Sequence, residues 1–514
     1  MSPNVIKKIF IKEKIMEEMM EDVVEETTVS KKPVGKLDKF FGITERGSTL
    51  RTEIFAGITT FFAMCYIVLV NPSQIAADGA NGWLAGIIGS AAAGLGQVYN
   101  AVFVGSILAT VIGTLLMAFV AKMPFAQAAG MGLNSFFCTC FVSAGVFAGQ
   151  TPVDSYQGGL IIIFISGIIF LLLSVTGLRQ YIAKALPDCL KKAIPAGIGL
   201  FIAFIGFKNS GIVVADRWTF VGLVDLTKWE FAAPALAAFI GLIIIGILGK
   251  FKFKGNIIVG ILISAVLYYL FTWQLPSFEF TSLGTIFSDF GTIGVTALFT
   301  PSAWNFAFGH VGVFNAICYI ITFCLIDMFD TIGTLFGTAS QANMLDENGD
   351  PINLDQCMLC DSIGTVAGAM LGTSTITTFV ESSAGVAAGG RTGLASVVTA
   401  ACFLLCLFVS PFASIIPTVA TAPALIYVGV LMLSNFAKVD LSDITNAIPA
   451  FLALVLMPLT YSIANGIGVG AISYVLLKLF TGKYTKQDIV VTIIAAIFVV
   501  RFILTFTGTY PVYA

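Results

Sequence analysis

Long apolar stretches follow one another from Glu53 onward, each separated from the next by a short polar segment. The first half predicts helical spans over 54–70, 101–121, 126–145, 158–176, 193–207, 231–248 and 256–272. A polar connection at 273–312 leads to seven more, at 313–337, 357–372, 374–388, 394–410, 421–435, 446–461 and 463–480. Stretches of this kind suit the thickness of a bilayer. The pattern therefore predicts an all-α polytopic membrane protein with fourteen transmembrane segments.

One further apolar run, 488–508, contains Arg501 and does not fit this count. It is interpreted either as a surface or peripheral helix, or as a sign that 446–480 is divided wrongly. Composition supports the membrane assignment, because the 514 residues are 57% hydrophobic and 11% charged. Soluble domains have roughly 45–50% and about 25%. The 51 glycines suit closely packed or broken helices.

Composition also excludes several functions. The net charge is −2 and no basic stripe is present, so nucleic-acid binding has no electrostatic basis. The single histidine, His310, rules out His-rich metal sites. Cys357 and Cys360 have redox or half-zinc spacing, but no second pair accompanies them, so they are interpreted as packed thiols. No metal, cofactor or enzymatic nucleophile is expected.

The basic residues predict the orientation. Ten lysines and arginines precede Ile54, and the loops 177–192 and 249–255 are basic, whereas 273–312 has none. By the positive-inside rule this places the N-terminus in the cytoplasm. The loop 338–356 is an exception, since it should be cytoplasmic but carries only acids.

A weak internal repeat indicates two halves. Ile194-Pro195-Ala196-Gly197 opens one span, and Ala422-Pro423-Ala424-Leu425 opens another in the corresponding position. Seven spans per copy would make the copies cross the bilayer in opposite directions. Inverted repeats are typical of transporters that hold their substrate near the midplane between broken helices.

Two carboxylates interrupt the span 313–337. Asp327 and Asp330 are three positions apart and so share a helix face, which Thr331, Thr334 and Thr338 extend as a polar stripe. An intramembrane acid costs about 2.5–3.5 kcal/mol on insertion scales, which favours a functional role. A structural hydrogen-bonded pair or an interfacial position is the alternative.

A second interruption lies in 373–385. A stretch rich in Thr, Ile, Phe and Val favours extended backbone and then meets Glu381-Ser382-Ser383-Ala384-Gly385, where a helix can begin. Such a break is tolerated in a membrane only where it is buried or lines a cavity. Glu381 is therefore predicted at a strand-to-helix break, and a helix-start acid at the membrane edge is the alternative.

A third interruption is Gly130-Met131-Gly132-Leu133-Asn134, followed by Ser135, Phe136 and Phe137. The glycines permit irregular backbone, and the amide of Asn134 both donates and accepts. The two phenylalanines are candidates for stacking on a flat ligand. Packing roles for the asparagine and the rings are equally consistent with the spacing. Carboxylates, an amide and aromatic rings, with no fixed positive charge nearby, suit a neutral planar solute.

These motifs resemble the AzgA-like purine permeases of the nucleobase–cation symporter-2 (nucleobase–ascorbate) group. The resemblance covers about residues 36–480 in order, beginning with Arg51-Thr52-Glu53-Ile54 and Val70-Asn71-Pro72. It continues through the three interruptions, then Gly390-Arg391-Thr392-Gly393 and Pro458-Leu459-Thr460-Tyr461. It departs at Ala129, where proline is expected, and at Ser135, where alanine is usual. The missing proline puts the third-span break in doubt, and the extra hydroxyl could alter base selectivity.

The resemblance implies a seven-plus-seven inverted repeat in which a core domain moves against a gate domain. The third and tenth spans would be short strand–helix elements that meet at the substrate. The expected divisions are a cytoplasmic tail (1–50), core halves (51–180 and 313–415), gate halves (181–275 and 416–514) and an extracellular connection (276–312).

The function implied is proton-coupled import of hypoxanthine, guanine or adenine across the cell membrane. The expected substrate-binding residues are Glu381, Asp330, Asn134, Ser382, Thr334 and Phe136, and the expected proton-coupling residues are Asp330, Glu381 and Asp327. A homodimer is expected only by analogy. Another planar heterocycle (uracil, xanthine or urate) and an anion carrier of the same architecture are the alternatives.

Overall fold

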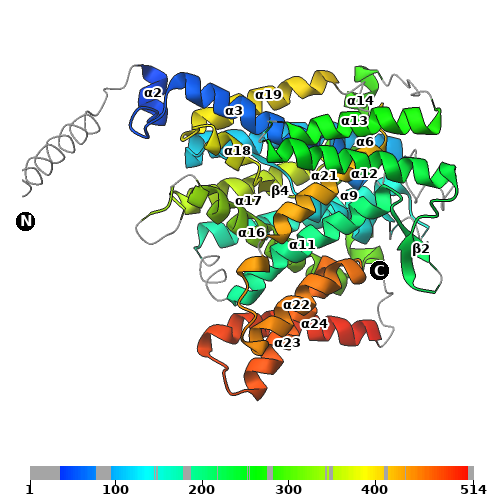
Figure 1. Ribbon diagram of the computed structural model, residues 1–514. Coiled ribbons are helices and arrows are strands. Elements are labelled where there is room, and N and C mark those ends of the chain that lie inside the picture. The colour runs from blue at the N-terminus through cyan, green and yellow to red at the C-terminus, as the bar shows by residue number, and fades with distance from the viewer. Residues whose placement is uncertain are drawn as a thin grey trace, which may run out of the picture.

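The structure, a computed structural model, is almost entirely helical (Figure 1). It describes residues 35–76, 94–143, 145, 149–177, 187–216, 218–251, 253, 255–274, 282–341, 344–346, 351–409, 415–434 and 436–506. Within these ranges, eight helices are long and apolar enough to cross a membrane, and five shorter apolar helices accompany them. The predicted all-helical polytopic membrane protein is thereby confirmed. The tail predicted over 1–50 falls within the described ranges only from residue 35, where α2 (Lys36–Phe41) precedes the first span.

The first seven segments follow the predicted order. The chain runs through α3 (Leu50–Met64) with α4 (Ile67–Ile75), α6 (Leu95–Leu116), β1 (Gln127–Ala129) with α7 (Met131–Phe137), α9 (Pro152–Val175), α11 (Asp188–Asn209), α12 (Trp229–Lys250) and α13 (Asn256–Thr272).

The second series repeats this order of elements. It consists of α16 (Val313–Gln341), α17 (Leu354–Met370), β4 (Ile376–Thr378) with α18 (Ser382–Ala387), α19 (Gly393–Leu405), α21 (Thr418–Leu433), α22 (Ile444–Leu459) and α23 (Ile463–Phe480). In each series the third member is a strand followed by a short helix. The fifth member carries an internal proline, Pro195 in α11 and Pro423 in α21.

The two strands pair with each other near the middle of the molecule (Figure 1). They are antiparallel, with Gln127 opposite Thr378 and Ala129 opposite Ile376, and every residue of both strands is buried. The pairing satisfies backbone groups that would otherwise have no partner at membrane depth. Ala129 ends β1, so the third-span break forms without the proline that the resemblance led us to expect.

The described part of the connection between the two series, from residue 282, is largely helical. It contains α14 (Leu283–Asp289) and α15 (Pro301–Trp304), which pack against α6 and α9 respectively. Asn100 of α6 donates to Asp289 at 2.8 Å. A short hairpin of β2 (Val213–Asp216) and β3 (Phe220–Leu223) joins α11 to α12 and has mostly exposed side chains.

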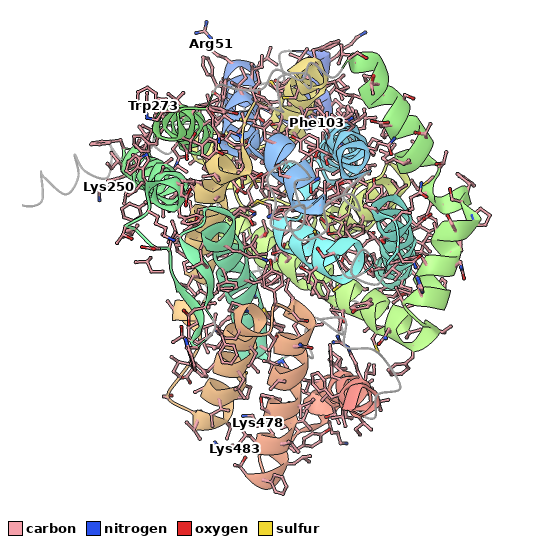
Figure 2. The ribbon with its side chains drawn as sticks, turned by 90° about the vertical axis from the view of Figure 1, so that its right-hand side faces the viewer. Arg51, Phe103, Lys250, Trp273, Lys478 and Lys483 are labelled. Atoms are coloured by element: carbon pink, nitrogen blue, oxygen red, sulfur yellow. The ribbon has the colours of Figure 1, made fainter. Side chains whose placement is uncertain are left out.

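The helices pack as two groups. The strand group consists of the two strands with α3, α4, α6, α7, α9 and α16–α19, which contact one another; the flanking group consists of α11–α13 and α21–α23. Figure 2 shows Phe103 inside the strand group and Trp273 and Lys250 at the margin of the flanking group. The groups meet closely where α7 crosses α11, since a Cβ at Gly132 would lie 2.3 Å from Cγ2 of Ile198.

The apolar run after the second series forms one more helix, α24 (Ile489–Phe506). It runs back along α23, because the Tyr474 hydroxyl donates to Asp488 at 2.9 Å and a Cβ at Gly468 would meet the ring of Phe498. It also reaches α16, where the Arg501 guanidinium lies 5.8 Å from the ring centroid of Tyr319. The division of 446–480 into two spans is therefore correct, and α24 is an additional element.

Candidate substrate cavity

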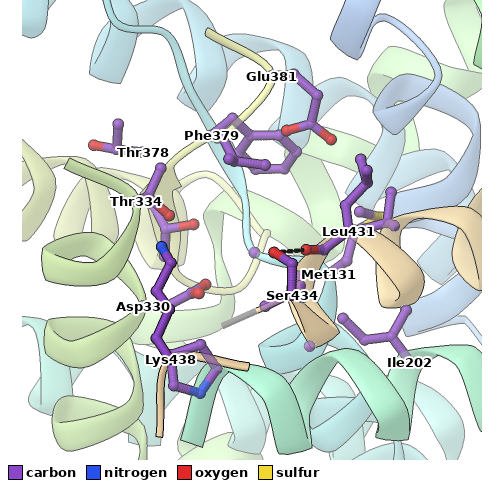
Figure 3. A pocket seen from close by; sticks show the side chains of 17 residues that line it. Met131, Ile202, Asp330, Thr334, Thr378, Phe379, Glu381, Leu431, Ser434 and Lys438 are labelled. Atoms are coloured by element: carbon purple, nitrogen blue, oxygen red, sulfur yellow. Dashed lines mark hydrogen bonds between the residues drawn. The ribbon is translucent and has the colours of Figure 1, made fainter. Parts of the chain in front are cut away.

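A cavity of about 160 Å³ lies between the strand group and the flanking group (Figure 3). The start of α7, one face of α16 and the chain from β4 to Glu381 line one side, and α11, α21 and the segment after α21 line the other. A cavity of about 150 Å³ holds a benzene-sized ring. This space therefore fits a small flat molecule, and both helix groups contact whatever occupies it.

The α16 side of the cavity is polar. Asp330 and Thr334 line it and are partly exposed. They are four positions apart, so one face of α16 presents a carboxylate and a hydroxyl in succession (Figure 3). Only these two members of the predicted polar stripe line the cavity. The shared face predicted for Asp327 and Asp330 is not found, because Asp327, like Thr331, is buried and bonds to α17 instead.

Glu381 reaches the same cavity from the turn between β4 and α18. Its side chain is 8% exposed, and its Oε1 accepts a hydrogen bond from the Tyr66 hydroxyl at 2.6 Å. The strand ends at Thr378 and the helix begins at Ser382. The predicted strand-to-helix break at this position is therefore present, and the backbone break directs Glu381 into the cavity.

The flanking side is apolar except at its open end. Pro195, Ile202 and Met432 form the wall, whereas Ser434 and Lys438 are exposed. Ser434 donates to the Leu431 carbonyl at 2.7 Å (Figure 3). The expectation that no fixed positive charge lies near these groups is wrong, because Lys438 also lines the cavity. This lysine belongs to the segment that follows α21.

Asn134 does not line the cavity, contrary to the expectation. Its carbonyl oxygen accepts from the Ser374 hydroxyl, and its amide donates to Asn71, whose own amide donates to Ser106 and Thr373. All five side chains are buried. Asn134 is therefore part of a hydrogen-bond network that joins α7 to α4, α6 and the chain before β4.

Phe136 and Ser382 also lie away from the cavity lining. Phe136 is fully buried and packs against Phe323 of α16, with ring centroids 5.0 Å apart. The Ser382 hydroxyl accepts from the Ala126 amide at 3.0 Å and ties α18 to the residue before β1. Both residues hold the strand–helix elements in place. The side chain of Ser135 is outside the described part of the chain.

Asp327 is buried behind the strand pair rather than in the cavity. Its Oδ2 accepts from Thr365 of α17 at 2.7 Å, and Thr365 also contacts the backbone of β4 at Ile376. A second buried acid, Asp361 of α17, accepts from Gln127 at 3.0 Å and from Thr331 at 2.5 Å. The two carboxylates connect α16 and α17 to the strands.

Tyr66, Asp361 and Lys438 were not identified from the sequence. Asp361 left a usable signal, because an acid inside the apolar range 357–372 is as unusual as Asp327 in its span. The sequence gives no comparable signal for Tyr66, since one tyrosine in an apolar helix is ordinary. Lys438 follows a span and reads as a loop residue. His310 ends a helical turn before α16 and is exposed, outside the span as expected.

The arrangement can bind a small flat solute that carries several N–H groups. Two carboxylates can accept hydrogen bonds, the Thr334 hydroxyl can donate or accept, and apolar side chains form the walls. The Thr378 hydroxyl is directed to Asp361 and Gln127 instead. Within the described ranges no group of three or more His, Cys, Asp or Glu side chains could hold a metal ion.

Comparison with known proteins agrees with this geometry. The permease family matches residues 51–469. Adenine permease AdeQ of Escherichia coli is 36% identical over 475 residues, which cover 91% of this chain and 97% of AdeQ. Guanine/hypoxanthine permease PbuG of Bacillus subtilis is 38% identical over 464 residues, which cover 90% and 99% of the two chains.

Two solved structures share the fold. The transmembrane domain of the cyanobacterial bicarbonate transporter BicA aligns with a TM-score of 0.57 at 16% identity, over 81% of this chain and 97% of that domain. SLC26A9 aligns with a TM-score of 0.51 at 11% identity, over 92% and 71% of the two chains. The resemblance drawn from the sequence motifs is confirmed: the chain is a multi-pass transport protein, not an enzyme, and belongs to the permease family.

Proposed function

We propose that this permease imports purine nucleobases (adenine, guanine or hypoxanthine) together with protons across the cell membrane. The observation that carries the proposal is that Asp330 and Glu381 line one cavity of ring-sized volume between the two helix groups. The printed substrates of the similar permeases, adenine and guanine/hypoxanthine, support the same solute class.

The chemistry of a purine matches the lining. A neutral purine presents ring N–H groups at its edge, and adenine and guanine add an exocyclic amino group; Glu381 is the proposed acceptor for these donors. Thr334 lies one helical turn from Asp330 and is proposed to bond the other edge of the base. Met131 and Ile202 line the cavity and are proposed to cover the faces of the ring.

Proton coupling is assigned to carboxyl groups, because the only histidine lies outside the spans. A protonated carboxyl donates a hydrogen bond and an ionised one only accepts. Occupancy of the cavity by a base is therefore linked to the protonation of Asp330 and Glu381. Asp327 is buried and is not part of the cavity lining, which makes Asp330 the preferred coupling residue.

Movement of the strand group, as core, against the flanking group, as gate, would expose the cavity alternately. The proposed boundaries are 51–180 and 313–415 for the core and 181–275 and 416–514 for the gate, related as inverted repeats. The cavity opens toward Ser434 and Lys438 at the end of α21. With the N-terminus in the cytoplasm, this end faces the cytoplasm.

Uptake of radiolabelled purines by cells that lack their own purine carriers tests the proposal, with and without a protonophore. Accumulation of at least one purine that the protonophore abolishes is expected. Purine uptake that is unaffected by the protonophore would exclude proton symport. If no purine is taken up, purines would be excluded as the substrate class.

Lys438 favours one second candidate, an anion carrier, because it places a cation at the cavity mouth and a bicarbonate transporter shares the fold. The two carboxylates that line the same cavity argue against an anion as the substrate. The same cells tested with labelled bicarbonate and sulfate distinguish the two functions, and labelled uracil, xanthine and urate test the remaining planar solutes.

A further inference from the structure

Tyr66 connects the first span to the candidate substrate anchor. It occupies the break between α3 and α4, its side chain is fully buried, and its hydroxyl donates to Glu381 Oε1 at 2.6 Å. Tyr66 is the one side-chain donor to this carboxylate among the described residues, and it holds Oε1.

The two ends of this hydrogen bond are held in fixed relation by close packing. A Cβ at Gly385 of α18 would lie 2.0 Å from Thr60 Oγ1 and 2.7 Å from the Ala56 carbonyl oxygen of α3. Only glycine permits this approach, so α18 lies directly on α3. The helix that follows Glu381 and the helix that precedes Tyr66 are therefore in direct contact.

We propose that Tyr66 is a positioning residue for substrate recognition. It fixes the carboxylate plane of Glu381, so that Oε2 meets the N–H edge of the base. The inference rests on the proposed function, because it assigns Tyr66 a role through Glu381. A glutamate has several rotatable bonds, and fixing one oxygen removes that freedom before the substrate arrives.

The test compares Tyr66→Phe, Glu381→Gln and the double variant in purine uptake, with KM and Vmax corrected for the amount of folded protein. Tyr66→Phe removes one oxygen and keeps the ring. It should raise KM about 10-fold, the order expected for a hydrogen bond to a charged group, with little change in melting temperature. The double variant should match Glu381→Gln alone, because Tyr66 acts only through that carboxylate.

Tyr156→Phe is the matched control. Tyr156 is also a fully buried tyrosine within a span, and its hydroxyl donates to the Gly372 carbonyl. Neither residue is part of the cavity lining. This variant should keep the wild-type KM even where stability falls. If Tyr66→Phe yields too little folded protein, Tyr66→Met removes the same donor with an apolar side chain that fills irregular space.

The outcomes separate the two proposals. If Tyr66→Phe keeps the wild-type KM while Glu381→Gln strongly reduces uptake, only the positioning role of Tyr66 is overturned. The same conclusion follows if the effects of the two substitutions on uptake multiply in the double variant. Wild-type uptake by Glu381→Gln overturns the anchor and the role of Tyr66 with it.

Discussion

Asp330 and Glu381 face one cavity from two elements that are distant in the sequence, the long helix α16 and the turn that ends β4. The turn reaches α16 because β4 pairs with β1 inside the membrane and α18 begins immediately afterwards. The carboxylates are brought together by the strand–helix breaks, so the irregular backbone and the site are one feature.

Asp330→Asn should separate purine movement from the proton gradient. The amide cannot gain or lose a proton at neutral pH but keeps the shape and one acceptor oxygen. The protonophore should therefore inhibit the residual uptake of this variant by much less than it inhibits wild-type uptake. Asp440→Asn, in an exposed segment before α22, is the control and should stay fully sensitive. Full sensitivity in Asp330→Asn would exclude Asp330 as the coupling group.

Thr334→Val should weaken binding without disturbing the fold. The side chain lines the cavity and is partly exposed, so the loss of its hydroxyl removes at most one hydrogen bond to the base. A net value of about 0.5–1.5 kcal/mol corresponds to a rise in KM of roughly 2- to 13-fold. Competition by unlabelled adenine and guanine would measure this rise for each base. Equal KM values for variant and wild type with both bases would place the hydroxyl outside the site.

Asn134→Ala should act on stability. The substitution leaves the Ser374 hydroxyl and the Asn71 carbonyl oxygen without their buried partner, and each unmet group costs about 1–3 kcal/mol. The melting temperature and the folded amount should fall, while KM of the surviving protein stays within about 2-fold of wild type. A normal melting temperature with a large rise in KM would instead indicate that Asn134 contacts the substrate.

Asp361→Ala should destabilise the strand pair. The carboxylate accepts from Gln127 of β1 and Thr331 of α16. Its removal leaves the buried Thr331 hydroxyl without this acceptor and leaves the Gln127 amide with only a 3.5 Å contact to Thr378. Asp361→Asn keeps one acceptor oxygen and should fall between alanine and wild type in thermal stability. The order of melting temperatures in detergent checks this, and an alanine variant as stable as the wild type would contradict it.

The helix α24 should cross the membrane. It runs antiparallel to α23, a candidate membrane span, and 18 residues at 1.5 Å each give about 27 Å, close to the roughly 30 Å of a bilayer core. Tags inserted before α2 and after α24 should then react with an impermeant reagent from opposite faces of the membrane. Reaction from the same face would make α24 a surface helix.

Much of this architecture could be predicted from one sequence, because membrane spans and their interruptions leave strong local signals. Each of the fourteen predicted ranges falls on an observed segment. The strand–helix breaks also occur at Gly130 and Glu381, as the small and β-favouring residues there predict. Ala129 shows that strand pairing, which is a long-range contact, forms the third-span break without proline.

The cavity lining was predicted only in part, because a polar residue in a span does not reveal which direction it faces. Asp330, Thr334 and Glu381 line the cavity, whereas Asn134, Ser382 and Phe136 stabilise the elements around it. Distinguishing these roles needs the partner of each group, and the partners come from other spans. Tyr66 and Lys438 were missed for the same reason.

The most direct test of the central claim is proton-driven uptake of labelled guanine, hypoxanthine and adenine by Glu381→Gln beside the wild type, at equal folded amounts. The amide keeps the size of the side chain but loses one acceptor oxygen and the negative charge. The account predicts that uptake of the purine carried by the wild type falls by at least 10-fold. Wild-type uptake by this variant, still abolished by a protonophore, would contradict it.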